Sequence, residues 1–128
     1  MAKTGPYQQA CPIARTLDIV GDRWTMLIIR DLFLGRRRFS DFVRSSPGLP
    51  PKLLSERLKR LEGHALIERI VYSQHPLRAE YRLTEKGRSL SPIVEAITEW
   101  GLQHLFEGEP ELRDGVERFI RSKVPESN

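Results

Sequence analysis

The sequence has a single cysteine and no apolar run of membrane-spanning length. One cysteine excludes an internal disulfide framework and a cysteine-rich zinc site. The longest apolar stretch, residues 24–29, is far below the roughly 20 residues that cross a bilayer. The first residues of the chain also lack the apolar segment of a secretion signal. We therefore expect a cytoplasmic protein with no membrane span and no metal site.

Signatures of catalysis are absent from the sequence as well. His64, His75 and His104 lie far apart, and no HExxH or CxxC pattern stands beside them. There is no glycine-rich phosphate-binding loop and no GxSxG nucleophile elbow. The sequence therefore predicts a protein that is not an enzyme and that uses no cofactor.

The positive charge of the chain is concentrated in its middle. The 128 residues carry a net charge of +4 and are 39% hydrophobic, as expected of a single folded domain. Nine basic and three acidic residues lie between positions 30 and 60, a net +6, whereas four basic and seven acidic residues lie from position 99 onward, a net −3. This polarity suits contact of one face with an anionic polymer, and its alternative is an ordinary solvated surface.

Apolar spacing and turn residues predict a mainly helical fold with one small antiparallel hairpin. A break or kink is expected near Ser91, because Pro92 interrupts a helical pattern that Thr84 caps. The expected helices cover residues 11–20, 23–34, 40–44, 52–62, 85–105 and 112–123, and the expected strands cover residues 66–72 and 79–83. This α+β order is that of a winged helix-turn-helix, with a DNA-binding unit at 11–83 and dimerisation helices and a tail at 84–128.

The fourth expected helix has the division of residues that a DNA-recognition helix needs. Leu54, Leu58 and Leu61 fall on one side of a helical wheel, and Leu53 flanks them. Lysines and short polar groups fall on the opposite side, where they would reach base edges and phosphates. We predict that residues 51–62 enter a major groove and that the connection at 73–78 lies near a minor groove. An ordinary amphipathic surface helix is the alternative.

Further cations flank this helix. The three arginines at 36–38 precede Ser40, the expected N-cap of the third helix, and suit a phosphate. Arg78 in the hairpin connection either approaches the minor groove or pairs with Glu80 or a phosphate. The full predicted DNA-binding set is Arg36, Arg37, Arg38, Ser40, Lys52, Ser55, Glu56, Arg57, Lys59, Arg60, His75 and Arg78.

Apolar stripes on the first and the long C-terminal helix predict a dimer. A core of this size hides only some of these side chains, so a second copy of the chain is the expected partner. In the alternative, the long helix folds back on its own domain. The predicted interface residues are Ile13, Leu17, Ile93, Ile97, Trp100 and Leu105. Two recognition helices about 34 Å apart would then face a pseudo-palindromic operator in double-stranded DNA.

Several short strings, taken in order, resemble HxlR-type winged helix-turn-helix regulators, which are relatives of the MarR group. The strings are Cys11-Pro12-Ile13, Gly21-Asp22-Arg23-Trp24-Thr25, Arg37-Arg38-Phe39-Ser40, Leu53-Leu54-Ser55-Glu56-Arg57-Leu58 and Leu83-Thr84-Glu85-Lys86-Gly87. The resemblance spans residues 11–105 and implies a homodimeric transcription factor whose fourth helix reads the major groove. The chain departs from the family at Pro50, where Ser or Thr is usual, and at Ala65, where Gly is usual.

Cys11 is the candidate signal input. It stands at a helix start with Arg15 one turn on, and the helix dipole and the guanidinium both favour the reactive thiolate. The family resemblance implies sensing of oxidants or electrophiles at this place, and a disulfide would have to join two subunits or a small thiol. A buried, inert thiol is the alternative.

Two other functions stay open beside a DNA-binding repressor. One is a winged-helix module that binds protein or RNA, and the other is a regulator that responds to a small ligand while Cys11 is inert. The basic face at Lys52, Ser55 and Lys59 favours DNA, because a helix that only docks on protein does not need it.

Overall fold

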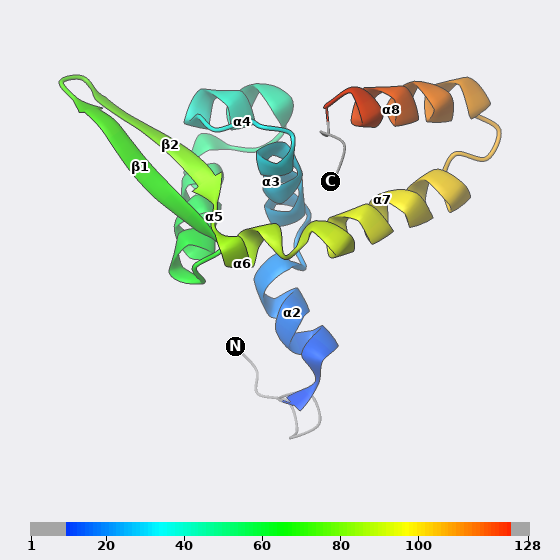
Figure 1. The fold of residues 1–128 in the computed structure, drawn as a ribbon, viewed down its shortest axis with the longest axis horizontal. Coiled ribbons are helices and arrows are strands. Elements are labelled where there is room, and N and C mark those ends of the chain that lie inside the picture. The colour runs from blue at the N-terminus through cyan, green and yellow to red at the C-terminus, as the bar shows by residue number, and fades with distance from the viewer. Residues whose placement is uncertain (1–9, 124–128) are drawn as a thin grey trace.

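The structure is a computed structural model, and it describes residues 10–123. In Figure 1, α3, α4 and α5 form the centre, the hairpin projects to one side, and α7 leads away on the other side before α8 turns back. The elements are α2 (Pro12–Val20), α3 (Arg23–Phe33), α4 (Phe39–Ser45), α5 (Pro51–Gly63), β1 (Ile67–Gln74), β2 (Leu77–Leu83), α6 (Glu85–Arg88), α7 (Ser91–His104) and α8 (Pro110–Lys123). This order confirms the predicted mainly helical fold with one antiparallel hairpin.

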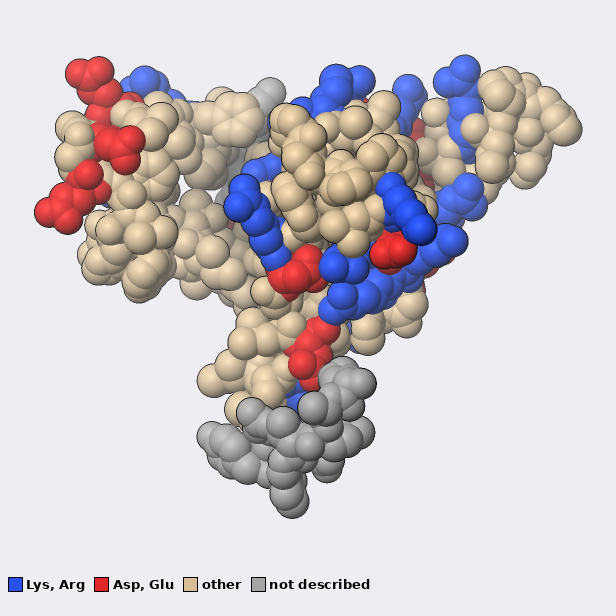
Figure 2. Space-filling model, turned by 180° about the vertical axis from the view of Figure 1, so that it is seen from behind, with Lys and Arg blue, Asp and Glu red and all other residues tan. Residues whose placement is uncertain are grey.

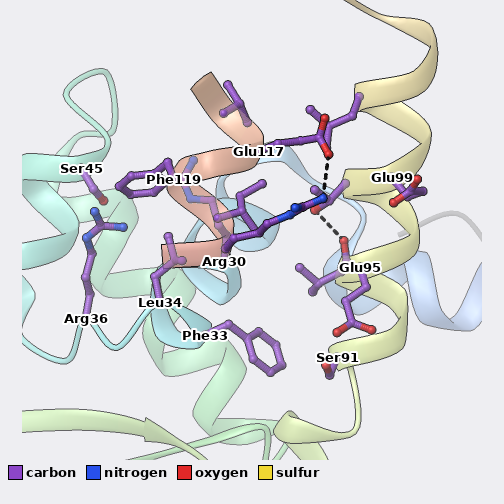
Figure 3. A pocket seen from close by; sticks show the side chains of 16 residues that line it. Arg30, Phe33, Leu34, Arg36, Ser45, Ser91, Glu95, Glu99, Glu117 and Phe119 are labelled. Carbon is purple, nitrogen blue, oxygen red and sulfur yellow. Dashed lines mark hydrogen bonds and ion pairs between the residues drawn. The ribbon is translucent and has the colours of Figure 1, made fainter. Parts of the chain in front are cut away.

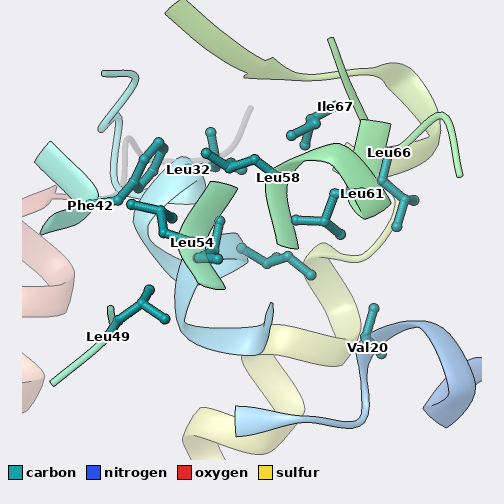
Figure 4. Close-up of a cluster of buried hydrophobic side chains, with 11 residues drawn as sticks. Val20, Leu32, Phe42, Leu49, Leu54, Leu58, Leu61, Leu66 and Ile67 are labelled. Atoms are coloured by element: carbon teal, nitrogen blue, oxygen red, sulfur yellow. The ribbon is translucent and has the colours of Figure 1, made fainter. Parts of the chain in front are cut away.

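The leucine face of α5 forms the centre of the core. Leu54, Leu58 and Leu61 are at most 1% exposed and lie in one cluster with Phe42 of α4 (Figure 4). Ile28 of α3 belongs to the same cluster. Burying each such side chain contributes roughly 1.5–3 kcal/mol relative to leaving it exposed. The division of α5 into an apolar and a polar side is therefore confirmed.

The start of α3 is held by Asp22. Its carboxylate accepts hydrogen bonds from the backbone N–H of Thr25 at 3.0 Å and from the Thr25 hydroxyl at 2.6 Å. It also faces Arg57 at 3.3 Å and Arg60 at 3.7 Å, both from α5. Burial raises the pKa of Asp22, but the bonds from Thr25 and the charge of Arg57 outweigh it and lower the pKa overall. One carboxylate thus caps α3 and ties it to α5.

The expectation that Ser40 caps the third helix is wrong. The helix begins one residue earlier, with Arg38 as the N-cap. Asp41 inside the first turn accepts from the backbone N–H groups of Arg38 at 3.0 Å and Arg37 at 3.2 Å. The bond from Arg38 is the main reason why the pKa of Asp41 is lowered. Both bonds go to Oδ2 of Asp41, so this carboxylate fixes the backbone at the start of the helix from within the first turn, and Ser40 does not cap it.

The two departures from the family pattern have different local outcomes. Pro50 occupies the N-cap of α5 without a side-chain cap, and Pro51 takes the first helical position, where a missing N–H costs nothing. Ala65 follows the C-cap His64 in a left-handed conformation, with φ of 61°. Glycine adopts this conformation freely and alanine does not, which is a physical reason for the usual glycine.

The hairpin is longer and its connection shorter than predicted. We expected strands at 66–72 and 79–83 with a six-residue loop, but Ser73 pairs with Arg78 and Gln74 with Leu77. Only His75 and Pro76 remain in the turn, joined by a cis peptide bond. Polar residues continue the strands because this part of the hairpin is largely exposed, so hydrophobic alternation gave no signal there.

The break predicted near Ser91 occurs: α6 ends at Arg88, α7 begins at Ser91, and Pro92 lies in the first turn of α7. The Thr84 hydroxyl accepts from the Gly87 N–H at 3.0 Å and donates to the Ala65 carbonyl at 2.6 Å. A Cβ on Gly87 would collide with the carbonyl of Leu66, so this position requires glycine. These contacts attach the start of α6 to the end of the hairpin. Because α7 follows α6 directly, they also set the direction in which α7 leaves.

Candidate nucleic-acid interface

The outer side of α5 presents the polar residues that the helical wheel predicted. Lys52, Glu56 and Lys59 are exposed and Ser55 is half-buried, opposite the buried leucines. Among the described residues, Lys52, Glu56 and Lys59 make neither an ion pair nor a side-chain hydrogen bond with another side chain or backbone group. These groups are held on a rigid helix while remaining available to a ligand.

Two arginines of the same helix turn the other way. Arg57 reaches Asp22, and the Arg60 guanidinium donates to the backbone carbonyls of Asp18 and Ile19. Their side chains are only 24% and 37% exposed. Arg57 and Arg60 therefore hold α5 against the junction of α2 and α3, although both belonged to the predicted DNA-binding set.

The arginine run at 36–38 does not act as a unit. Arg36 turns inward to Asp31 at 3.0 Å. Arg37 is exposed, and its carbonyl accepts from the backbone N–H of Tyr81 at 2.8 Å, which links this segment to β2. The Arg38 guanidinium lies 5.7 Å from the ring centre of Tyr72 in β1. Only Arg37 and Arg38 thus stand beside the hairpin with exposed side chains.

The tip of the hairpin carries His75 and Arg78, both exposed. Within the described part of the chain, Arg78 forms no ion pair with Glu80, the partner that we considered for it. The ion pair that crosses the hairpin joins Arg82 to Glu68 at 3.6 Å. The Arg78 side chain therefore remains available to a partner outside the chain.

The charged groups separate along the molecule. Figure 2 shows Lys and Arg side chains across the part that carries α5 and the hairpin, and Asp and Glu side chains gathered at the far end, where α7 leads into α8. The acids of that end include the exposed Glu107, Glu109 and Glu111. The predicted separation of charge along the sequence is thus also a separation in space.

The predicted dimer residues form exposed stripes on α2 and α7. Ile13 is 70% exposed and Leu17 56%, while Ile97 and Trp100 are 54% and 58% exposed. Ile93 and Leu105 are exposed as well. In the single chain, then, the long helix does not cover this stripe with its own domain.

Cys11 immediately precedes α2 and is a free, half-buried thiol. It makes no capping hydrogen bond with its side chain. No group of three or more His, Cys, Asp and Glu side chains in residues 10–123 is arranged to hold a metal ion. No helix in the same residues is both long and apolar enough to span a bilayer.

Three aspartates that organise the site were not singled out from the sequence. The sequence contained a signal for Asp22, because an aspartate directly before a helical pattern is a typical N-cap residue. Asp41 had a weaker one, as an acid in a first helical turn. Asp31, fully buried in α3, had none, because two of its three partners, Arg36 and Ser45, come from outside α3.

The fold and the exposed polar face of α5 define the class of the protein, a DNA-binding transcriptional regulator with a winged helix-turn-helix. Residues 19–109 match the family described as HxlR-like helix-turn-helix, and the chain belongs to this family. The predicted family is therefore confirmed. Because the family consists of transcriptional regulators, the expectation that the chain is not an enzyme is confirmed as well.

Curated relatives and solved structures agree with this assignment. The chain is 38% identical over 96 residues to the HTH-type transcriptional regulator YybR of Bacillus subtilis, covering 75% of this chain and 77% of that one. It is 44% identical over 93 residues to the regulator Mb3122 of Mycobacterium bovis, where the match covers 73% of this chain and 58% of the relative.

Several of the similar structures carry a redox description, among them structures of HypR and YodB. The redox regulator HypR in its oxidized form shares 38% identity and a TM-score of 0.69, covering 73% of this chain and 97% of that one. The reduced form of the transcriptional regulator YodB from B. subtilis shares 36% identity and a TM-score of 0.63, with coverage of 73% and 93%.

Proposed function

We propose that the chain is a sequence-specific regulator that places α5 in the major groove of double-stranded DNA. The observation that carries the proposal is the free polar face of α5, with Lys52, Ser55, Glu56 and Lys59 opposite a fully buried leucine face. Lysines there reach phosphates, and the short polar and acidic groups reach base edges. Arg57 and Arg60 serve this contact indirectly, because they fix the helix on α2 and α3.

The hairpin and the segment before α4 supply the flanking contacts in this proposal. Arg37 and Arg38 stand beside the hairpin and suit phosphates, and Ser40 lies in the first turn of α4, where backbone N–H groups favour anions. His75 and Arg78 at the tip suit a minor groove, where negative potential is concentrated. Arg36 is left out of the contact, because Asp31 engages it.

Selection of bound sequences from a random duplex pool identifies the operator and tests the proposal. With that operator, Lys59→Ala should weaken binding and reduce the slope of log K against log salt by about one, if Lys59 displaces a counterion from one phosphate. Arg118→Ala is the matched control, because Arg118 is exposed on α8 away from α5. Binding that is independent of salt, or preference for RNA over duplex DNA, would refute the proposal.

We further propose that two copies pair through the stripes on α2 and α7. Exposed Ile13, Leu17, Ile97 and Trp100 give a self-complementary apolar surface that water disfavours. Light scattering should give twice the chain mass. Ile97→Glu should give the monomer and weaken operator binding. Ser122→Glu adds the same charge to an exposed position of α8, outside both stripes, and should stay dimeric. A monomeric wild type contradicts this arrangement.

The redox response is the third part of the proposal. Cys11 stands two residues before Ile13 of the dimer stripe, so a bond formed at its sulfur acts on the dimer contact. HypR is described as a redox regulator, and YodB has also been solved in a diamide-treated form. When diamide oxidises two Cys11 thiols to an intersubunit disulfide, it takes up their two electrons and two protons. Cys11→Ser should then keep its operator affinity in diamide while the wild type loses it. Equal losses would contradict the proposal.

Repression is the expected direction of control. A dimer that covers about one duplex turn within a promoter excludes other proteins from that DNA. A reporter gene behind the selected operator should therefore be less active when the chain is present, and more active with Ile97→Glu. Increased reporter activity with the wild type would identify an activator.

A further inference from the structure

A cavity of about 810 Å³ lies between the helix-turn-helix core and the C-terminal arm, which consists of α7 and α8. Its walls come from α3, α4, α7 and α8, and Figure 3 shows Phe33 and Phe119 directed toward it from different helices. Val94, Leu102, Val116 and Ile120 add further apolar surface. This volume lies within the range of cavities that enclose a small organic molecule.

One wall of the cavity carries an uncompensated positive charge. Arg30 and Arg36 both bind Oδ1 of Asp31, at 2.9 Å and 3.0 Å, so one buried carboxylate serves two guanidinium groups. Ser45 donates to the other oxygen of Asp31. Nη1 of Arg30 and both Nε and Nη2 of Arg36 make no hydrogen bond within the described chain. The side chains of Arg30 and Arg36 are 40% and 34% exposed, and both line the cavity.

The opposite wall has the reverse charge. Glu95 and Glu99 lie on α7, across the cavity from Arg36 (Figure 3). Glu117 of α8 is already paired, with Arg113 at 3.2 Å and with Arg121 at 3.6 Å. An anionic group inside the cavity is therefore directed toward the arginine end, and an apolar body fits the remaining walls.

The cavity is separate from the proposed dimer stripe. Val94, Thr98 and Leu102 of α7 face the cavity, whereas Ile97 and Trp100 lie on the other side of the helix and are exposed. The wall from α8 also lies outside residues 19–109, the part that matches the family. A second copy that pairs through the stripe thus leaves the cavity free.

We propose that this cavity binds a small amphipathic organic anion, with its charge on Arg30 and Arg36 and its apolar body between α7 and α8. The bound ligand would contact the guanidinium groups of Arg30 and Arg36. Both groups bind Asp31, which also binds Ser45 of α4, so the ligand is coupled to the helix-turn-helix. The link to DNA affinity rests on the proposed function, whereas binding of the anion does not.

Three probes with the same ring and different charge test the headgroup. 2-Naphthoate, 2-naphthylmethanol and 2-naphthylmethylammonium are titrated calorimetrically into the full chain without DNA. Naphthoate should bind at least about tenfold more tightly than the alcohol, as expected of a charge-assisted hydrogen bond, and the ammonium more weakly than the alcohol. Equal affinities, tighter binding of the ammonium, or no binding at all would overturn the proposal.

Matched variants locate the binding site. Arg30→Gln leaves Asp31 with Arg36 and Ser45, and should lower naphthoate affinity about tenfold without changing the affinity for the alcohol. Arg118→Gln is the control for charge, because Arg118 is exposed on α8 and does not line the cavity, and it should change neither affinity. Val116→Trp fills the cavity and should abolish binding, whereas Leu112→Trp, exposed on the same helix, should not. Binding that survives Val116→Trp, or a change of oligomeric state in that variant, would assign the cavity to another occupant.

Gel shifts on the selected operator test the link to DNA. Saturating naphthoate should change operator affinity at least about threefold in the wild type and not in Val116→Trp, as expected of coupling of about 0.7 kcal/mol or more. Calorimetric binding without this change would overturn the regulatory part alone. Loss of all duplex binding in the absence of naphthoate would instead refute the proposed function, while the calorimetry would still decide the cavity.

Discussion

Asp22 is a single side chain on which the placement of the recognition helix depends. Its carboxylate caps α3 through the Thr25 N–H at 3.0 Å and faces Arg57 and Arg60 of α5. Asp22→Ala removes the cap and both ion pairs at once. Asp22→Ser keeps an oxygen that caps the helix and removes only the charge. Comparison of the two substitutions therefore separates the cap from the ion pairs.

The expected cost of each substitution follows from the geometry. Loss of a helix N-cap costs about 1 kcal/mol. The side chains of Asp22 and Arg57 are 31% and 24% exposed, so that ion pair and its neighbour contribute about 0–1 kcal/mol each. Asp22→Ala should therefore lose roughly 2 kcal/mol and Asp22→Ser roughly 1 kcal/mol or less. For a domain of this length, 1 kcal/mol shifts the Tm by roughly 3–5 °C.

Thermal unfolding at several pH values measures both contributions. Because the pKa of Asp22 is lowered from its usual 3.8, its charge stabilises the fold fully above that value and loses this effect as the pH falls through the lowered pKa. The wild type should thus lose more stability than Asp22→Ser between about pH 5 and pH 2. Equal Tm values for the Ser and Ala variants at neutral pH would refute the capping role of Asp22. If the Tm of the wild type and of Asp22→Ser fell in parallel with pH, the stabilising role of the Asp22 charge would be refuted.

Two further substitutions test the backbone and the core of the same unit. Ala65→Gly should raise the free energy of unfolding by about 0.5–1 kcal/mol, because φ of 61° strains alanine; Ala96→Gly in α7 should lower it by a similar amount. Thermal melts measure both effects. If neither substitution stabilised the chain, or if both did, backbone strain at Ala65 would be contradicted. Leu58→Asp should abolish cooperative unfolding, because it buries an unpaired charge where the side chain is 1% exposed. Lys59→Asp on the exposed face should keep a native melting profile, and if both variants melt alike, the orientation of α5 is wrong.

The sequence predicted those parts of the fold that depend on local patterns. The leucine spacing of α5 determines which side is buried, because a helix repeats every 3.6 residues whatever surrounds it. Pro92 separates α6 from α7 for an equally local reason, since proline lacks a backbone donor. The extent of the hairpin was missed, because its exposed outer part has no apolar alternation to read.

The arginines show why the candidate site was predicted less well than the fold. By composition Arg36, Arg57 and Arg60 are equivalent to Arg37 and Arg38, and all five were assigned to DNA. Their roles separate only in three dimensions, because Asp22 and Asp31 lie beside three of them and beside none of the others. A cluster of basic residues in sequence therefore gives the sign of a surface, but partners from other elements decide which charges remain free for DNA.

The same partners give the helix-turn-helix two separate supports. Asp22 ties α5 to α3 on the side of α2, and Asp31 ties the end of α3 to Arg36 and, through Ser45, to α4. The partners of Asp22 all come from α3 and α5, so this support includes no residue of α7 or α8. The arginines that bind Asp31, Arg30 and Arg36, also line the cavity beside α7 and α8. A ligand in the cavity therefore acts on α4 and on the segment before it. An effector in the cavity should consequently alter the contacts of Arg37 and Arg38 with phosphates more than the base contacts of α5. In gel shifts with naphthoate, the salt dependence of binding should then change while the sequence preference does not.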